Sequence, residues 1–303
     1  MTGTIKNTRS TFTRRRLLAT AMATGVCQLL PVTRALGQNA LLPLDTPGLD
    51  HLDVIVPDVA ATARFYMGVF NTALHAQPFR GGFRYFVLLG ELNEQREVGY
   101  LAIGDSAGRG SYIGHFCTTV ADWRQNGQAI FSQMDEAFAD AGFGDFPGST
   151  GFGGIFADPD GLEIQFLPAP DTLVTAAVPS DLVQWHQGMV TPHGVDHVVL
   201  QVSDLERAIS YYRILYGQET RRGNNRADFI FASSSTTLQL EQSRYEYGMN
   251  PKIARFGIKV SPFDRNTVTN GITALGGSVL ESEIPGSLRF SDNDGNVAEL
   301  VPV

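Results

Sequence analysis

The 303-residue sequence predicts an α+β fold in which four βαβββ modules form two similar halves. The first observation is a repeat: GLDHLDVIVPD at 48–58 returns as GVDHVVLQVSD at 194–204. The second is a repeat near the end of each half, DPDGLEIQF at 158–166 and DNDGNVAEL at 292–300. The third is that each half divides again into two units of similar element order. Such internal repeats indicate a duplicated architecture.

The elements of the first half follow from hydrophobic spacing. Alternation predicts a strand over 51–56, and helical spacing predicts a helix over 59–70, after which three short strands run to about residue 103. A second module opens with a strand at 115–120 and continues with a helix over about 122–141 and strands that end at 166.

The second half repeats this order, and its second module opens with a strand at 255–260. The domains are therefore predicted at 48–168 and 194–303. They are joined by a linker over 169–193 that contains Pro170 and Pro179.

Strand alternation also assigns faces. In the first strand, Leu52, Val54 and Val56 are expected to pack under the helix, which leaves His51 and Asp53 on the opposite face. The same alternation places Glu163 and Gln165 together on that face of the closing strand. Polar side chains from separate strands are thus expected to converge on one concave surface.

Residues 1–37 have a different character, with six basic and no acidic residues. The stretch Thr13-Arg14-Arg15-Arg16-Leu17-Leu18 precedes a short apolar run that is too short to span a membrane, which takes about 20 residues. It resembles a twin-arginine (Tat) export signal. We therefore expect export through the Tat machinery to the periplasm or outside the cell, with no stable membrane anchor.

Composition limits the remaining partners. The chain is 43% hydrophobic and 18% charged, as in folded soluble proteins, and its net charge of −8 argues against a nucleic-acid partner. Residues 38–303 hold 17 basic and 31 acidic groups, a net charge of −14. Removal of residues 1–37 would leave Cys117 as the one cysteine, so no intramolecular disulfide is expected. A homodimer is compatible with these features.

The Asp-His opening strands, the Phe65-Tyr66 and Tyr211-Tyr212 helices and the two Asp-x-Asp-Gly turns resemble the vicinal oxygen chelate (VOC) superfamily. This superfamily includes glyoxalases, extradiol dioxygenases and antibiotic resistance proteins. The resemblance implies two tandem VOC domains, each a curled mixed sheet around a cleft, with metal ligands on the first and last strands of the modules.

Carried over by position, the resemblance implies a first-half metal site of His51, His115 and Gln165, with Glu163 as a substitute third ligand. The runner-up site in the second half is His197, Gln239 and Glu299. Neither half has the two histidines and one carboxylate of a dioxygenase. Arg255 replaces the second histidine of the second half and is expected to bind an anion instead.

These residues lead to two hypotheses of different class. The first is an exported metalloenzyme acting on a small oxygen-bearing substrate, dioxygenase-like or, alternatively, a glyoxalase-like lyase or isomerase. Its ion would be Fe(II), with Mn, Ni or Zn as alternatives, and Tyr100 and Arg255 are its candidate catalytic residues. The second is a metal-free small-molecule binding protein, which Gln165, Gln239 and Arg255 favour. The enzyme is preferred.

Overall fold

The computed structural model describes residues 40–79, 81–90, 99–144, 154–168, 178, 180–183, 187–231, 235–244 and 253–303. Residues 40–303 form one compact unit. The predicted export signal at 1–37 lies outside the described residues. Among those described, no helix has the length and apolar character needed to cross a membrane.

The first half forms a seven-stranded mixed sheet in the order β2-β3-β4-β1-β5-β7-β6. Its helices are α1 (Val59–Val69) and α2 (Trp123–Asp140). The strands are β1 (Gly48–Val56), β2 (Leu74–Phe79), β3 (Gly82–Leu88), β4 (Tyr100–Asp105), β5 (Tyr112–Val120), β6 (Gly154–Ala157) and β7 (Glu163–Pro168). After α2 the described residues contain two strands rather than the predicted three, and residues 145–153 lie outside the description.

The second half forms an eight-stranded mixed sheet in the order β13-β14-β15-β12-β8-β11-β10-β9. Its first strand begins at Thr191, three residues before the predicted boundary. The helices are α4 (Leu205–Tyr216) and α5 (Arg265–Ala274), and α3 (Ser180–Val183) lies in the predicted linker. The strands are β8 (Thr191–Val202), β9 (Arg221–Arg222), β10 (Arg226–Ile230), β11 (Thr237–Gln242), β12 (Ile253–Ser261), β13 (Ser278–Leu280), β14 (Leu288–Ser291) and β15 (Val297–Pro302). Two curled mixed sheets, one per half, confirm the predicted fold class.

Three of the helices begin at an aspartate that caps them. The side chains of Asp58, Asp204 and Asp264 each accept a hydrogen bond from the backbone N–H three residues later. An N-cap carboxylate satisfies an N–H that has no partner within the helix, so the strand-to-helix turn is encoded locally.

The predicted faces of the opening strand are confirmed. Leu52, Val54 and Val56 are fully buried in the main core. The opposite face carries His51 and a separate small apolar cluster that includes Phe86 and Tyr100. One face of the sheet therefore provides stability, while the other holds buried polar groups.

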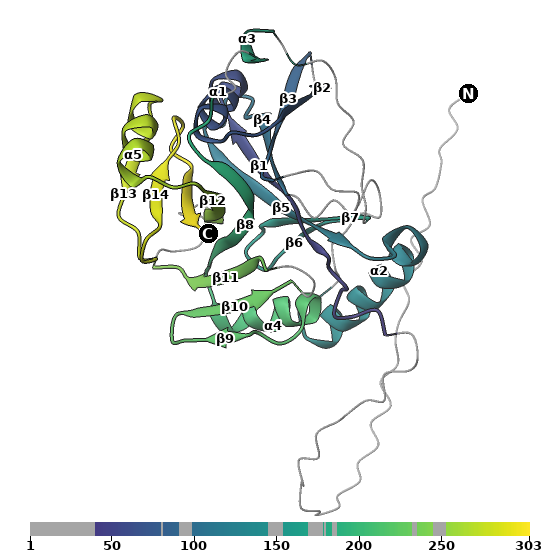
Figure 1. Cartoon of the computed structure of the whole chain (residues 1–303). Helices are drawn as coiled ribbons and strands as arrows, with labels where there is room; N and C mark the ends of the chain where they lie inside the picture. The colour runs from purple at the N-terminus through teal and green to yellow at the C-terminus, as the bar shows by residue number, and fades with distance from the viewer. Residues whose placement is uncertain are drawn as a thin grey trace, which may run out of the picture. The chain divides into compact units, whose positions relative to one another are not determined.

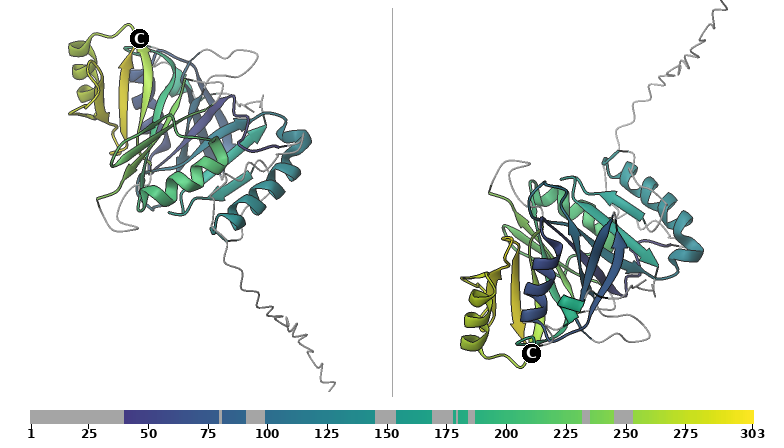
Figure 2. Two further views of the ribbon diagram at one scale, coloured as in Figure 1. Left: turned by 90° about the horizontal axis from the view of Figure 1, so that it is seen from below. Right: turned by 90° about the horizontal axis from the view of Figure 1, so that it is seen from above.

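The two halves interlock through helices and turns related by the duplication. Helix α1 packs against α5, and α2 packs against α4, as Figures 1 and 2 show. Tyr66 on α1 donates its hydroxyl to Asp292, and Tyr212 on α4 donates to Asp158, both at 3.0 Å. The helix tyrosines and the Asp-x-Asp-Gly turns thus do more than pack and turn, since they join one half to the other.

Candidate functional site

Three neighbouring strands bring His51, His115 and Gln165 together. They lie on β1, β5 and β7, which are adjacent in the first sheet. The Nε2 atoms of the two histidines are 3.1 Å apart, and Gln165 Oε1 is also 3.1 Å from His115 Nε2. The structure therefore assembles the predicted first-half set. The predicted substitute, Glu163, is exposed, and its carboxylate lines a neighbouring cavity.

Each of these histidines has an aspartate at its other ring nitrogen. His51 Nδ1 is 2.6 Å from Asp50 Oδ1, and His115 Nδ1 is 3.4 Å from Asp53 Oδ2. A hydrogen on Nδ1 that faces a carboxylate leaves a lone pair on Nε2, and metal-bound histidines are oriented in this way. Arg84 in turn forms an ion pair with Asp53 and balances its charge.

Tyr100 on β4 lies beside the cluster. Its ring stacks on the His51 ring with centroids 5.0 Å apart. Burial, and then the charge of Asp50 and a hydrogen bond to it, raise the pKa of the Tyr100 hydroxyl well above 10. Tyr100 was predicted to be a catalytic residue, but its hydroxyl is already engaged by Asp50. Its geometry suits a positioning residue for His51.

The three atoms that face one another in this cluster are His51 Nε2, His115 Nε2 and Gln165 Oε1, and all three can act as acceptors of a hydrogen bond or as metal ligands. Burial, and then the proximity of the His51 ring, lower the pKa of His115 to about 4, so the His115 ring is neutral at pH 7. A hydrogen on His115 Nε2 would bond only one of its two close neighbours, and would turn a bare Nδ1 toward the Asp53 carboxylate. Around a metal with bonds of about 2.1 Å, neighbouring ligand atoms lie about 3.0 to 3.4 Å apart. The observed separations of 3.1 Å therefore fit a metal ion.

A second group of donor atoms shares His51. Ligand atoms of Asp50, His51 and Cys117 lie within 4.8 Å of one another, and all three residues are buried. Here His51 Nδ1 contacts Asp50 at 2.6 Å, so its other nitrogen remains directed at His115. The two groups share His51 and differ in their other members, so a change at Cys117 separates them experimentally.

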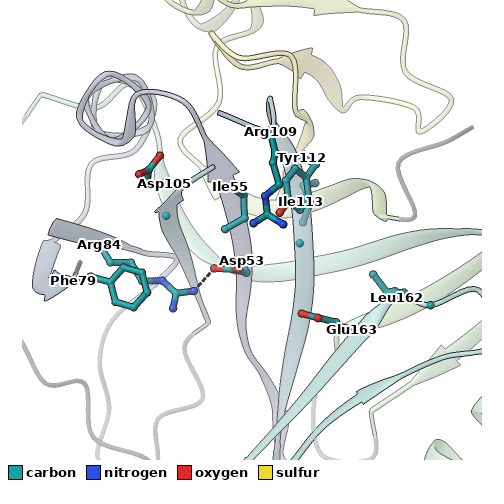
Figure 3. Close-up of a pocket in the computed structure, with 13 residues that line it drawn as sticks. Asp53, Ile55, Phe79, Arg84, Asp105, Arg109, Tyr112, Ile113, Leu162 and Glu163 are labelled. Carbon is teal, nitrogen blue, oxygen red and sulfur yellow. Dashed lines mark hydrogen bonds and ion pairs between the residues drawn. The ribbon is translucent and has the colours of Figure 1, made fainter. Parts of the chain in front are cut away.

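A cavity of about 550 Å³ lies next to Asp53, and His51, His115 and Gln165 are not among its lining residues. Its wall includes Asp53, which contacts His115, and the Glu163 side chain. Figure 3 shows Arg84 on one side of this space and Arg109 with Tyr112 on the other. The cavity has the size of a small-molecule site, for which about 300 to 1,000 Å³ is typical.

The corresponding cluster in the second half is closed. Glu299 is fully buried and accepts hydrogen bonds from the hydroxyls of Ser282 and Ser287. Its Oε2 lies 3.7 Å from His197 Nε2 and 3.6 Å from the Arg289 guanidinium. Burial alone would raise the pKa of Glu299, but contacts with His197, the two serines and Arg289 lower it to about 2.

His197 in the same cluster lies between two carboxylates, those of Asp196 and Glu299. Burial opposes protonation of His197, yet Asp196 and Glu299 raise its pKa above 6.5. The guanidinium of Arg289 stands where a metal would have to compensate Glu299. The runner-up set therefore fits a metal poorly, and the first half is the better candidate.

Arg255 and Gln239 also differ from the expectation. Both terminal nitrogens of Arg255 donate to Glu241, at 2.6 and 3.0 Å, so its charge is balanced within the protein. In this arrangement the anion beside Arg255 is the Glu241 carboxylate, and binding of an external anion by Arg255 stays a prediction. Gln239 is buried on β11, and its strand pairs it with Val199 rather than with His197.

Sequence reasoning missed the supporting residues of the site. The Asp-His dipeptides at 50–51 and 196–197 carried a readable signal, because each aspartate contacts the Nδ1 atom of the adjacent histidine. Arg84 gave no such signal. It reaches Asp53 from β3, which is two strands away in the sheet.

Residues 48–166 match the family described as the Glyoxalase/Bleomycin resistance protein/Dioxygenase superfamily. No curated protein resembles the chain closely enough to count as a match.

Several solved structures share the fold. The 2,3-dioxygenase LapB from Pseudomonas sp. KL28 is 12% identical, with 86% of this chain and 93% of that chain covered and a TM-score of 0.61. The Mn(II)-bound glyoxalase from Novosphingobium aromaticivorans is also 12% identical, with coverages of 86% and 83% and a TM-score of 0.58. Homoprotocatechuate 2,3-dioxygenase from Arthrobacter globiformis is 14% identical, with coverages of 86% and 81% and a TM-score of 0.58. At such identities the likeness concerns the fold, which hosts more than one chemistry.

Proposed function

We propose that this chain, whose residues 48–166 form a domain of the Glyoxalase/Bleomycin resistance protein/Dioxygenase superfamily, is a metal-dependent enzyme acting on a small oxygen-bearing organic substrate. One observation carries the proposal: the Nε2 atom of His51 and the amide oxygen of Gln165, which come from two other strands, each lie 3.1 Å from His115 Nε2. His51, His115 and Gln165 would hold a divalent ion.

The surrounding residues prepare this site. Asp50 accepts the Nδ1 hydrogen of His51, and the Asp53 carboxylate lies 3.4 Å from His115 Nδ1, so that both Nε2 atoms are directed inward. Tyr100 packs on the His51 ring and restricts its rotation. The neighbouring cavity, which is lined by Asp53 and Gly114 and not by the three proposed ligands themselves, offers room for a substrate. An ion bound there would supply Lewis acidity toward substrate oxygens.

The reaction class follows from the third ligand. Gln165 is neutral, so the ligand set leaves the full charge of a divalent ion in place, which favours Lewis-acid chemistry of the glyoxalase type. A dioxygenase-like reaction is the second candidate, favoured by the two-histidine set and by the structural similarity to LapB. Oxygen consumption by the Fe(II)-loaded protein in the presence of candidate substrates distinguishes the two.

Metal content tests the proposal. The purified full chain is incubated separately with Fe(II), Mn(II), Ni(II) or Zn(II), dialysed and analysed for bound metal. We expect about one ion per chain, retained in Cys117→Ser and in the surface control His193→Ala. We expect it to be lost in the double variant His51→Ala, His115→Ala, with circular dichroism confirming that the variant is folded. Wild-type metal content in the double variant would refute the site.

Export is a separate proposal. The twin-arginine pattern at Arg14 and Arg15 supports delivery by the Tat machinery to the periplasm or beyond. Replacing both with lysine is expected to retain the protein in the cytoplasm, as cell fractionation would show. Unchanged export of this variant would exclude the Tat route.

A further inference from the structure

The cavity near the His51, His115 and Gln165 cluster is lined by Arg109, a cation whose charge no described residue balances. Arg84 is paired with Asp53, but among the described residues no carboxylate lies within ion-pair distance of Arg109. Arg109 Nε donates to the Ser106 carbonyl at 3.3 Å, and its guanidinium lies 5.8 Å from the centroid of the Tyr112 ring. Its terminal nitrogens remain available for an acceptor from outside the protein.

The turn that carries Arg109 is held in place at both ends. Ser106 is fully buried, and its N–H donates to the Val56 carbonyl at 2.9 Å. The Arg109 N–H donates back to Ser106 at 3.1 Å, and the Ser111 hydroxyl accepts from Asn296 at 2.8 Å. A guanidinium on such an anchored turn loses less conformational freedom when it binds a ligand. It also has the planar donor pair that matches a carboxylate.

The rest of the wall restricts what the ligand is. Ile55, Ile113 and the rings of Phe79 and Tyr112 provide apolar surface beside Arg109. Glu163 lies in the same wall, and Figure 3 shows it below Arg109, on the side of Asp53 opposite to Arg84. A second negative charge on the ligand would be repelled there, whereas a neutral group would not.

We infer that this cavity binds small monocarboxylic acids with an apolar, preferably aromatic, body, and that Arg109 holds the carboxylate while Tyr112 and Phe79 contact the body. The acidic wall at Glu163 excludes dicarboxylates. This inference rests on the proposed function only in calling the ligand a substrate, because the binding itself needs no metal.

The test uses the full chain, both stripped of metal by a chelator and loaded with it. Phenylacetate, its neutral isostere phenylacetamide and the dicarboxylate homophthalate are titrated by calorimetry. We expect phenylacetate to bind at least about tenfold more tightly than either of the others, because a charge-assisted hydrogen-bonded pair with Arg109 is formed only by the carboxylate.

Variants assign the interaction to its residues. Arg109→Gln is expected to weaken phenylacetate binding about tenfold or more, and Arg109→Lys to restore part of it. The matched control is Arg221→Gln, an exposed arginine on β9 of the other sheet, which should bind phenylacetate as the wild type does. Glu163→Gln is expected to reduce the discrimination against homophthalate.

Wild-type phenylacetate affinity in Arg109→Gln would overturn the inference, as would equal affinity for phenylacetamide or no binding of either carboxylate by the wild type. Metal content measured on the same samples separates this failure from failure of the proposed function. If the wild type binds metal but no carboxylate, only the carboxylate-binding inference is refuted. If it binds phenylacetate but no metal, the carboxylate-binding inference holds and the proposed metal-dependent enzyme is refuted.

Discussion

The contact between Tyr212 and Asp158 predicts how the stability of the whole fold depends on pH. Asp158 is 6% exposed, and its Oδ1 accepts the backbone N–H groups of Asp160 and Leu162 at 2.9 and 2.7 Å. Its Oδ2 accepts the Tyr212 hydroxyl from the other half. The substitution Asp158→Asn keeps the shape and one acceptor oxygen while it removes the charge.

The magnitude follows from the buried charge. Burial raises the pKa of Asp158 from 3.8 to about 6, even though hydrogen bonds from Leu162 and Tyr212 act to lower it. A raised pKa means that the folded protein binds this proton more tightly than the unfolded chain. The stability this group contributes is therefore present below pH 3.8 and is lost as the pH rises through about 6. The difference of about 2 pKa units corresponds to about 3 kcal/mol, of which about 2 kcal/mol is lost between pH 4.5 and 7.5.

Urea unfolding at pH 4.5 and 7.5, followed by circular dichroism, measures this effect. Other groups titrate in the same range, so the quantity compared is the difference between Asp158→Asn and the wild type at each pH. We expect Asp158→Asn to gain about 2 kcal/mol relative to the wild type at the higher pH. Tyr212→Phe, which removes a donor to the carboxylate, should make the pH dependence steeper. Equal differences at both pH values would refute the reasoning.

Three further substitutions test the candidate metal site of the first half and the His197–Glu299 cluster of the second half. Gln165→Glu should lower the dissociation constant for Mn(II) at least about tenfold, because it adds a negative ligand; weaker binding in a competition titration would contradict the site. Asp50→Asn should weaken metal binding about 10- to 100-fold with the fold intact, since Asp50 orients a proposed ligand; unchanged affinity would show that this contact is dispensable. Gly257→Ala should lower the free energy of unfolding by about 1 to 3 kcal/mol, because a Cβ there would lie 2.2 Å from the buried His197 ring. Its control, Gly223→Ala, meets no atom closer than 3.8 Å and should change that free energy by less than about 0.5 kcal/mol.

Much of the candidate site was predictable because it depends on strand alternation. Period-two patterning places His51 and Gln165 on one face of their strands, whereas His115 was implied by the resemblance to the VOC superfamily; the strands of all three are neighbours in the sheet. The same reasoning could not choose between Gln165 and Glu163, which share a face. Only the register and curl of the sheet turned Gln165 toward His115 and left Glu163 exposed at the cavity.

The two halves differ in whether an arginine lies beside the histidine cluster. Strand alternation does not predict this difference, because it does not give the order of strands in a sheet. Arg255 pairs with Glu241 on β11, and Arg289 on β14 lies beside Glu299, so one arginine is balanced and the other takes the place of a cation. In the first half, Arg84 on β3 pairs with Asp53 and not with the Nε2 atoms of His51 and His115. Each pairing joins residues from different strands.

By itself the sequence determined the duplication, the α+β modules, the strand faces and the histidines, because each depends on local periodicity or on a repeat within the chain. Tertiary structure alone decided which histidine cluster has an arginine beside it, where the Arg109 guanidinium lies in the cavity, and how Tyr66 and Tyr212 join the halves. Most of those features depend on contacts between residues on different strands or in different halves, such as Tyr66 with Asp292 and Tyr212 with Asp158, and such contacts arise only when the sheets curl and pack.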